Sequence, residues 1–273
     1  MKILLLTNPL PNQVALANKI FYENKNLSII VRNNKESKKN IHSRLIEKFH
    51  SLLCSLGAVL VFKKMWNDIQ KHFQSEFSKF PVDPCLEVLD INDLSVLQIV
   101  EDLKPDLVLV SGTNLLKKEL IETIKNSGKI MNLHTGISPY VKGGPNCTNW
   151  CLSNKEFAYI GNTIMWLDVG VDSGNIIFSE QTLLSGDESF FLLHKKVLEH
   201  GHQIYIKVIQ EFFKGAYLPS IPQSKIGQGK LYLTRDWTPF KMFTALKNFI
   251  FFYKKSVHQN QNSINPILIK ISK

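Results

Sequence analysis

The chain has 273 residues, a length that suits one large or two small domains at roughly 100–200 residues per domain. With 44% hydrophobic and 21% charged residues, the composition excludes a wholly disordered or collagen-like chain. The formal net charge is +10, the four cysteines form no CxxC pair, and no apolar run is long enough to span a bilayer, so we expect a cytoplasmic protein with reduced thiols.

The N-terminal residues predict a βαβ unit. An apolar strand over residues 2–7 ends at a proline-rich turn, a helix with one apolar face follows over 13–23, and a second strand covers 27–31. Strand, helix and strand at this spacing favour a parallel sheet. No GxGxxG motif follows the first strand, and the first glycine of the chain is Gly57, so an NAD-type dinucleotide site is not expected.

Residues 33–82 are polar and helix-rich, which predicts a helical insertion with helices over 41–53 and 59–80. Beyond the insertion, strands and helices alternate. In chain order we expect a strand at 85–89, a helix at 96–103, a strand at 105–112, a helix at 117–126, a strand at 130–134, a short helix at 148–152, a strand at 158–166 and a long helix at 187–213.

The C-terminal residues differ from the rest in charge and pattern. After a linker come an expected strand at 230–234, a helix at 239–253 and a strand at 267–271. We therefore expect an α/β fold with a mostly parallel, Rossmann-like sheet and a small C-terminal α+β appendage. The expected division is a main domain over 1–213, which includes the insertion, and a small basic subdomain over 214–273.

Most of the positive charge lies in this C-terminal part. Residues 215–273 contain nine lysines and arginines against one acidic residue, Asp236. Such a field attracts polyanions, for example nucleotide phosphates, tRNA or an anionic lipid surface, and it equally suits the solvated face of an appended subdomain. The sequence alone leaves these alternatives open.

Asn132 and His134 stand at the end of an expected strand, directly before a loop rich in Gly and Pro. Residues two apart on a strand point to the same face, so we expect the amide and the imidazole to lie side by side. The carboxyl ends of parallel strands are where α/β proteins bind ligands. An amide donor beside an imidazole can stabilise an oxyanion on an attacked acyl carbon, whereas the alternative is a pair that satisfies the backbone of the turn.

A second candidate segment is the glycine-rich loop that contains Asp168 and Asp172. A carboxylate in this loop could orient the imidazole and accept a proton from an attacking amine. Its DxxxDxG spacing lacks the ligand ladder of a calcium loop. Taken alone, the loop is equally consistent with a solvated turn.

Together the two segments resemble a known family. The pattern Asn-x-His-x-Gly-x-x-Pro-x-x-x-Gly-Gly begins at Asn132, and Gly-x-Thr followed by Asp-x-Gly-x-Ile-Ile ends at Ile177. This pattern is similar to that of the folate-dependent formyltransferases, which include phosphoribosylglycinamide, methionyl-tRNA and sugar N-formyltransferases. The resemblance covers about residues 105–180. It implies transfer of a formyl group from N10-formyltetrahydrofolate to a primary amine, without a metal.

The resemblance also implies roles for individual residues. Asn132 and His134 would stabilise charge on the attacked formyl oxygen, and Asp172 would hold the imidazole and assist proton transfer. Two loops would line the pterin pocket through Gly112, Thr113, Asn114, Leu115, Leu116, Asp168, Val169, Gly170 and Val171. The amine substrate is expected to contact Gly136, Ser138, Tyr140, Gly143 and Gly144. Met165 stands where many members carry His, so a second histidine is not expected to take part.

Within this resemblance, the basic tail favours a nucleotide-linked amino sugar as the amine substrate. A nucleic acid is not expected, and a homodimer is left open. Methionyl-tRNA formylation is the alternative, which we rank lower because residues 214–273 look short for a tRNA-contacting barrel. Phosphoribosylglycinamide ranks third. From a different class, the chain could be a non-catalytic binding protein that kept the fold.

Three other patterns are expected to be structural. His194, His200 and His202 lack the i, i+4 pair of a zinc-binding helix. Cys147 and Cys151, one helical turn apart, are expected to be a buried pair rather than a redox couple. The apolar stripe in the helix at 239–253 could lie on a membrane, although packing on the main domain or a second subunit is the commoner arrangement.

Overall fold

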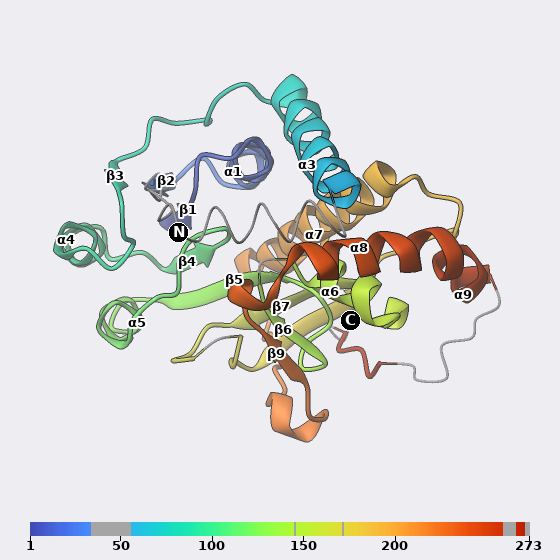
Figure 1. Cartoon of the computed structure of the whole chain (residues 1–273). Coiled ribbons are helices and arrows are strands. Elements are labelled where there is room, and N and C mark those ends of the chain that lie inside the picture. The colour runs from blue at the N-terminus through green and yellow to red at the C-terminus, as the bar shows by residue number, and fades with distance from the viewer. Residues whose placement is uncertain (34–55, 145, 171, 259–265, 271–273) are drawn as a thin grey trace.

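The computed structural model describes residues 1–33, 56–144, 146–170, 172–258 and 266–270, and it alternates strands and helices along the chain (Figure 1). The strands are β1 (Ile3–Thr7), β2 (Leu27–Arg32), β3 (Leu86–Val88), β4 (Leu107–Val110), β5 (Lys129–Thr135), β6 (Val141–Gly143), β7 (Gly161–Trp166), β8 (Ile176–Gln181) and β9 (Lys230–Tyr232). The helices are α1 (Pro11–Glu23), α3 (Leu56–Glu76), α4 (Leu94–Leu103), α5 (Lys118–Lys125), α6 (Cys147–Asn154), α7 (Phe190–Phe213), α8 (Pro239–Asn248) and α9 (Lys254–His258).

The described strands form a seven-stranded sheet in the order β3-β2-β1-β4-β5-β7-β8. The first five strands pair in parallel, whereas β7 runs antiparallel to β5 and β8 antiparallel to β7. The expected α/β fold with a mostly parallel sheet is therefore confirmed. Because β1, β4 and β5 are parallel neighbours, their carboxyl ends meet at one edge of the sheet, where ligand sites form in such folds.

Helices cover both faces of the sheet (Figure 1). The alternation of side chains along β1 shows why: Leu5 packs in the cluster that contains α1 and α7, whereas Leu6 packs in the cluster that contains α4 and α5. Both leucines are completely buried, which contributes roughly 1.5–3 kcal/mol each. A strand that is apolar on both faces can be stable only between two helical layers.

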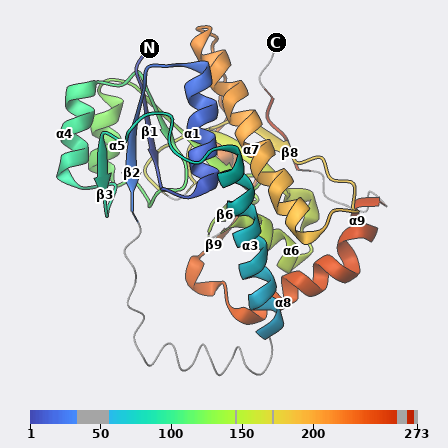
Figure 2. The same ribbon diagram turned by 90° about the horizontal axis from the view of Figure 1, so that it is seen from above.

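Part of the expected helical insertion is the long helix α3, which lies beside α1 and α7 (Figure 2). Its apolar side chains Phe62, Met65, Ile69 and Phe73 are buried, at the i, i+3 and i+4 spacings of one helix face. The helix expected at 41–53 lies outside the described residues. Through this buried face, α3 forms one wall beside the carboxyl edge of the sheet.

The C-terminal residues pack against the main domain. Strand β9 pairs in parallel with β6, and α8 lies against α6 and α3 (Figure 2). Beyond α8, a π-helical turn over Phe249–Tyr253 leads into α9. In the apolar stripe, Tyr253 is buried while Ile250 remains 60% exposed. The helix therefore packs on the main domain with part of its stripe, and the division at residue 213 stays a prediction.

The strand expected at 267–271 is wrong for the described residues 266–270, which form no regular element. Two hydrogen bonds nevertheless place this segment beside β8. The Ser179 N–H donates to the Ile269 carbonyl, and the Ile269 N–H donates to the Ser179 hydroxyl, each over 2.9 Å. Because one of the two partners is a side chain, the segment does not continue the backbone ladder that defines a strand.

None of the helices in the described part of the chain is long and apolar enough to cross a membrane.

Candidate functional site

Asn132 and His134 lie on β5, and Asp172 lies on the loop between β7 and β8. The Asp172 carboxylate comes within 3.3 Å of the His134 imidazole, measured from Oδ2 to Nδ1. Among the described residues, none hydrogen-bonds the Asn132 side-chain amide, which faces the cavities described below. The structure thus brings the three expected catalytic side chains to one edge of the sheet.

His134 is held by contacts on both ring nitrogens. Besides the Asp172 contact, its Nε2 lies 3.0 Å from the Val141 carbonyl oxygen and 3.6 Å from the Cys147 sulfur. Burial alone would lower the pKa of His134, but the Asp172 carboxylate, with smaller contributions from Cys147 and Val141, outweighs burial and raises that pKa to about 10. His134 is therefore a buried imidazolium at neutral pH, with Nε2–H donating to Val141 and Nδ1–H facing Asp172.

Asp172 is fixed from two sides. Its Oδ2 accepts a hydrogen bond from the Gly143 backbone N–H over 2.8 Å. Its backbone is in the left-handed region, with φ of 45°, which an Asp tolerates better than most residues. The Gln223 side-chain Nε2 donates to the carbonyls of Asp172 and Gly174 over 2.7 and 2.8 Å. Gln223 lies in the C-terminal residues, so that part of the chain helps to position the carboxylate.

Gly143 is a position where only glycine fits. Its φ is +90°, and a Cβ there would lie 2.1 Å from the Tyr232 carbonyl oxygen. This close approach is the pairing of β6 with β9, in which Gly143 stands opposite Tyr232. The same glycine donates to Asp172, so the backbone contact that joins the two parts of the chain also builds the site.

Two adjoining cavities open beside these side chains. The first has a volume of about 370 Å³ and the second about 410 Å³, both within the range of roughly 300–1,000 Å³ typical of small-molecule sites. Both are lined by Asn132 and Asp172, and His134 lines the second. A molecule in either cavity can therefore meet a molecule in the other at the Asn132 amide and the Asp172 carboxylate.

The first cavity lies where the pterin pocket was expected. Of the nine residues expected there, seven line it: Gly112, Thr113, Asn114, Leu115, Leu116, Asp168 and Gly170. Val169 is exposed and does not line it, and Val171 lies outside the described residues. The cavity also receives Tyr232, Leu233 and Thr234 from the C-terminal part. Asp168 points toward solvent, where a hydrogen bond from the Val169 N–H and the nearby Lys125 ammonium lower its pKa.

Of the residues expected to contact the amine substrate, some line the cavities and others do not. Gly143 lines both cavities and Gly144 lines the first, whereas Gly136, Ser138 and Tyr140 line neither. The Ser138 N–H donates to the Thr163 hydroxyl, and the Tyr140 ring stacks on Tyr159 with centroids 4.7 Å apart. The Gly136 carbonyl accepts a hydrogen bond from the same Thr163 hydroxyl over 2.7 Å. All three residues thus have structural partners, and their expected role in substrate binding stays a prediction.

Cys147 and Gln223 contact the catalytic side chains or their loop, and the sequence analysis did not predict either contact. Cys147 lines the second cavity and touches the His134 imidazole, although the sequence predicted only a buried cysteine pair. Cys151 is buried as well, which raises the pKa of its thiol, but it lines neither cavity. No local pattern marks Gln223, because its partners lie about fifty positions earlier in the chain.

Met165 lines the first cavity and is buried. Its sulfur lies 4.0 Å from the Gln223 Nε2, so this side chain supports Gln223 rather than the reacting groups. The three histidines of α7 have different surroundings. His194 bonds Asn149, His200 contacts Glu180, and His202 lies beside the second cavity.

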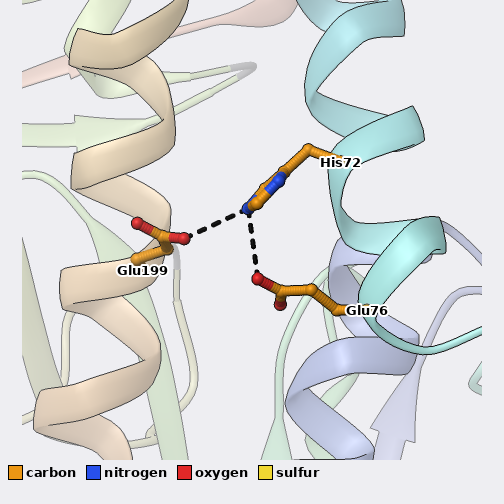
Figure 3. A group of neighbouring side chains, drawn as sticks. All are labelled: His72, Glu76 and Glu199. Carbon is orange, nitrogen blue, oxygen red and sulfur yellow. Dashed lines mark hydrogen bonds and ion pairs between the residues drawn. The ribbon is translucent and has the colours of Figure 1, made fainter.

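Elsewhere in the described residues, His72, Glu76 and Glu199 come close enough to share a cation (Figure 3). The His72 Nε2 lies 3.2 Å from one oxygen of each glutamate, and the Lys195 ammonium lies 3.5 Å from the same Glu199 oxygen. These contacts already make an ion-pair network. We interpret the cluster as a bridge between α3 and α7, and the expectation of no metal stays a prediction.

This geometry agrees with the family that the sequence matches. Residues 25–209 match the model of the formyl transferase family, and the chain belongs to this family.

Individual relatives fall into two groups. Over 143 residues, the chain is 32% identical to a methionyl-tRNA formyltransferase of Alkaliphilus oremlandii, a match that covers 52% of this chain and 44% of the relative. The chain thus spans less than half the length of that curated relative. Among solved structures, it resembles a sugar N-formyltransferase from a Shewanella species, with a TM-score of 0.56, 14% identity and coverage of 91% of this chain and 87% of the other.

A second solved structure is an N-formyltransferase from Helicobacter canadensis in complex with folinic acid and dTDP-3-aminofucose. The TM-score is 0.55 and the identity 16%, with coverage of 92% of this chain and 81% of the other. At these identities, the two structural likenesses show the shared fold alone.

Proposed function

We propose that the chain transfers a formyl group from N10-formyltetrahydrofolate to a primary amine. The observation that carries this proposal is the meeting of two cavities at Asn132 and Asp172, beside a buried His134 imidazolium. A two-substrate transfer needs two binding spaces that open onto one set of catalytic groups. The non-catalytic alternative gives no reason for a carboxylate and an imidazolium to be held at such a junction.

Asn132 is the hydrogen-bond donor in this proposal. As the amine nitrogen attacks, the formyl oxygen gains negative charge, which the Asn132 N–H stabilises from a fixed position on β5. His134 contributes its positive charge nearby, because both of its own N–H groups are already directed to Val141 and Asp172. The two side chains therefore act on the same developing charge in different ways.

Asp172 is the proton acceptor. It lines both cavities, so its carboxylate can take the proton that the attacking amine must lose. Gly143 and Gln223 keep the carboxylate in place, with the His134 ring 3.3 Å away. The bond between the formyl carbon and N10 of the folate then breaks, and Asp172 returns the proton to N10. The exchange therefore leaves an N-formyl amine and tetrahydrofolate, with no net change in protons on the protein.

The first cavity suits a folate. Its lining combines apolar side chains, such as Leu116 and Met165, with loop residues 112–116, 168, 170 and 172–174. An apolar slot suits the flat pterin ring, and loop N–H and C=O groups can bind its polar edge. When bound there, the folate supplies the formyl group.

We further propose that the amine belongs to a nucleotide-linked amino sugar. Support comes from the many amide and hydroxyl side chains that line the second cavity, among them Asn8, Gln13 and Asn146. Such groups suit a polyhydroxylated ring better than the apolar side chain of a methionyl group. The solved relative with dTDP-3-aminofucose supports the same class. Methionyl-tRNA remains the competing acceptor because the curated relative bears that activity in its name.

The test is formylation by the purified full chain with labelled N10-formyltetrahydrofolate. The acceptors compared are nucleotide-linked amino sugars, initiator methionyl-tRNA and glycinamide ribonucleotide, each with the wild type and with Asn132→Ala. We expect labelled product from the amino sugars, and loss of it in the variant. If label is transferred to the tRNA alone, the acceptor is methionyl-tRNA and not an amino sugar. Failure of the chain to bind a folate analogue would contradict the enzyme proposal.

We also propose a cytoplasmic location, since Cys85, Cys147 and Cys151 are free thiols.

A further inference from the structure

The C-terminal helical segment, residues 239–258, carries large apolar side chains that the fold leaves uncovered. The segment consists of α8, the π-helical turn and α9. One side of it, which includes Ala245 and Tyr253, is buried against the main domain. Four large apolar side chains on the segment are between 43% and 69% exposed: Phe240, Phe243, Ile250 and Phe251. Exposed apolar residues scattered singly are ordinary, whereas a cluster of them commonly marks an interaction site.

The exposed side chains share one face of the segment. Positions three or four apart are neighbours on a helix surface. The exposed positions 240, 243, 247, 251 and 255 follow this spacing through the π-helical turn, and positions 250 and 254 lie beside them. The segment therefore has one buried face and one exposed face, and the exposed face holds both phenylalanines and lysines.

The exposed face is positively charged. Residues 239–258 contain four lysines and no aspartate or glutamate. Lys254 forms an ion pair with Asp187 over 2.6 Å. Lys247 and Lys255 stand in the exposed series, and neither has an acidic partner among the described residues. A partner for this face must therefore offer negative charge as well as apolar surface.

A second copy of this chain does not meet that requirement. In a two-fold dimer the same face meets itself, which would bring Lys247 and Lys255 toward identical lysines without an acidic residue on the segment to compensate them. An anionic lipid surface supplies both features. Aromatic and aliphatic side chains enter the boundary between headgroups and acyl chains, while the long lysine side chains keep their ammonium groups among the phosphates.

The segment is placed where it can meet a surface without using the catalytic groups. Helices α8 and α9 lie at the margin of the molecule, on the side away from α4 and α5 (Figure 2). None of the residues 239–258, all of which the structure describes, lines either cavity. Contact through this face therefore involves no residue that lines the two cavities.

We propose that the exposed face of residues 239–258 binds the protein to an anionic lipid surface. The four apolar side chains enter the headgroup boundary, and Lys247 and Lys255 contact lipid phosphates. Each lysine near such a surface adds to the attraction, and the cytoplasmic leaflet of a membrane carries anionic lipids of this kind. The proposal stands on exposure and charge, and it does not depend on formyl transfer.

The test is binding of the purified full chain to lipid vesicles, measured by co-sedimentation. Vesicles of phosphatidylcholine alone are compared with vesicles of an equal mixture of phosphatidylcholine and phosphatidylglycerol, each at low and at high salt. One double variant, Phe243→Ser with Phe251→Ser, removes apolar surface. The other, Lys247→Glu with Lys255→Glu, reverses two charges.

Matched controls carry the same kinds of change on the other side of the molecule. Leu94→Ser alters an exposed apolar residue of α4, and Lys118→Glu reverses an exposed lysine of α5. Thermal unfolding confirms that every variant is folded. Affinity for a folate analogue, which involves neither the segment nor the control positions, should be the same in all of them.

We expect the wild type to bind the mixed vesicles, to bind the neutral ones much more weakly, and to lose binding at high salt. Each double variant should weaken binding to the mixed vesicles by about tenfold or more, because apolar insertion and charge attraction both contribute. Both controls should bind as the wild type does.

Three results would overturn the proposal. The first is an absence of wild-type binding to the mixed vesicles, and the second is an equal loss of binding in the controls. The third is self-association of the wild type that the Phe243→Ser, Phe251→Ser variant abolishes while vesicle binding is unaffected, since the face would then join two copies of the chain. Failure to formylate any amine would contradict the proposed function and leave lipid binding standing.

Discussion

The two cavities that meet at Asn132 are lined by different kinds of structure. The first is lined mainly by loops, residues 112–116, 168, 170 and 172–174, and by the C-terminal segment 232–234. The second is lined by strand and loop residues too, but it also receives residues of the helices α1, α3, α6 and α7, none of which lines the first. Loop backbone groups can bind a ligand whatever side chains are present, whereas a helix wall changes its chemistry with each substitution.

This difference suggests a division between a constant co-substrate and a variable acceptor. A cavity that binds its ligand through backbone groups can keep the same ligand while its side chains change. A cavity that binds its ligand through helix side chains, as the second cavity can, is able to change the ligand it prefers by single substitutions. Four predictions test whether the two cavities are distinct in this way and are joined at the three catalytic side chains.

The largest effect is expected at Asn132, which lines both cavities. In Asn132→Ala, kcat should fall by about 10²–10³-fold, because the donor to the developing negative charge is lost. The affinities for a folate analogue and for an amino sugar should change little, since neither cavity depends on this one amide for its shape. Steady-state kinetics and calorimetry measure the two effects, and near wild-type turnover would contradict the role of Asn132.

Asp172→Asn should lower kcat by about 10²-fold or more, because the proton acceptor is lost. It should also lower the pKa of His134 from about 10, since the Asp172 carboxylate is the main group that opposes the effect of burial. NMR titration of the His134 ring measures that shift. Asp168→Asn, in the same loop but directed to solvent, is the control and should leave the His134 pKa unchanged. An unchanged pKa in Asp172→Asn would mean that the ion pair is not what charges the ring.

A smaller effect is expected at Gln223, which holds the loop of the first cavity from the C-terminal side. In Gln223→Leu the two hydrogen bonds to Asp172 and Gly174 are lost, and we expect kcat to fall about tenfold. Binding of a folate analogue should weaken, while amino-sugar binding in the second cavity should persist. Lys225→Ala, on the same short 3₁₀ turn, is the control. Equal weakening of folate-analogue and amino-sugar binding would show that the two cavities do not bind their ligands independently.

The last prediction concerns the pH dependence of stability rather than turnover. The pKa of His134 is raised to about 10, so its contribution is present below its unfolded value of 6.5 and is lost as the pH rises toward 10. The pKa values of His194 and His202 are lowered to about 4 and 3 by burial, so their contribution is lost as the pH falls below 6.5. These histidines together favour a maximum of stability near pH 6.5.

Urea unfolding at a series of pH values measures this dependence. Asp172→Asn should flatten the alkaline side, and His202→Leu should flatten the acid side. A profile whose alkaline side is the same in Asp172→Asn as in the wild type would contradict the assignment to His134. Such an outcome would mean that His134 occupies its place on β5 without carrying the positive charge assigned to its ring.

The sequence predicted the parts of the site that depend on local spacing. Asn132 and His134 are two apart on a strand, and a period of two is enough to place them on one face. The alternation of apolar residues in β1 and the one-sided helices α1 and α7 likewise predicted a sheet between helical layers. The match of the loop that carries Asp172 rested on a family pattern, and the structure places its carboxylate beside the imidazole.

The expected strand at 267–271 shows where such reasoning fails. Its residues are apolar enough for a strand, yet residues 266–270 contact β8 partly through side chains and form no backbone ladder with it. The helix at 239–253 was expected as one element, but it passes through a π-helical turn at Phe249–Tyr253. Both differences depend on the surface against which the segment packs, which the local pattern does not contain.

By itself, the sequence determined most of the order of strands and helices, the mostly parallel sheet and the pairing of an amide with an imidazole, because these follow from short-range periodicity. It did not predict the strands β6 and β8. Only the tertiary structure decided that Gln223 positions Asp172, that Cys147 touches His134, and that residues of α1, α3 and α7 line one cavity. Those contacts join residues far apart in the chain. Their existence depends on how whole helices and strands pack, so no spacing in the sequence encodes them.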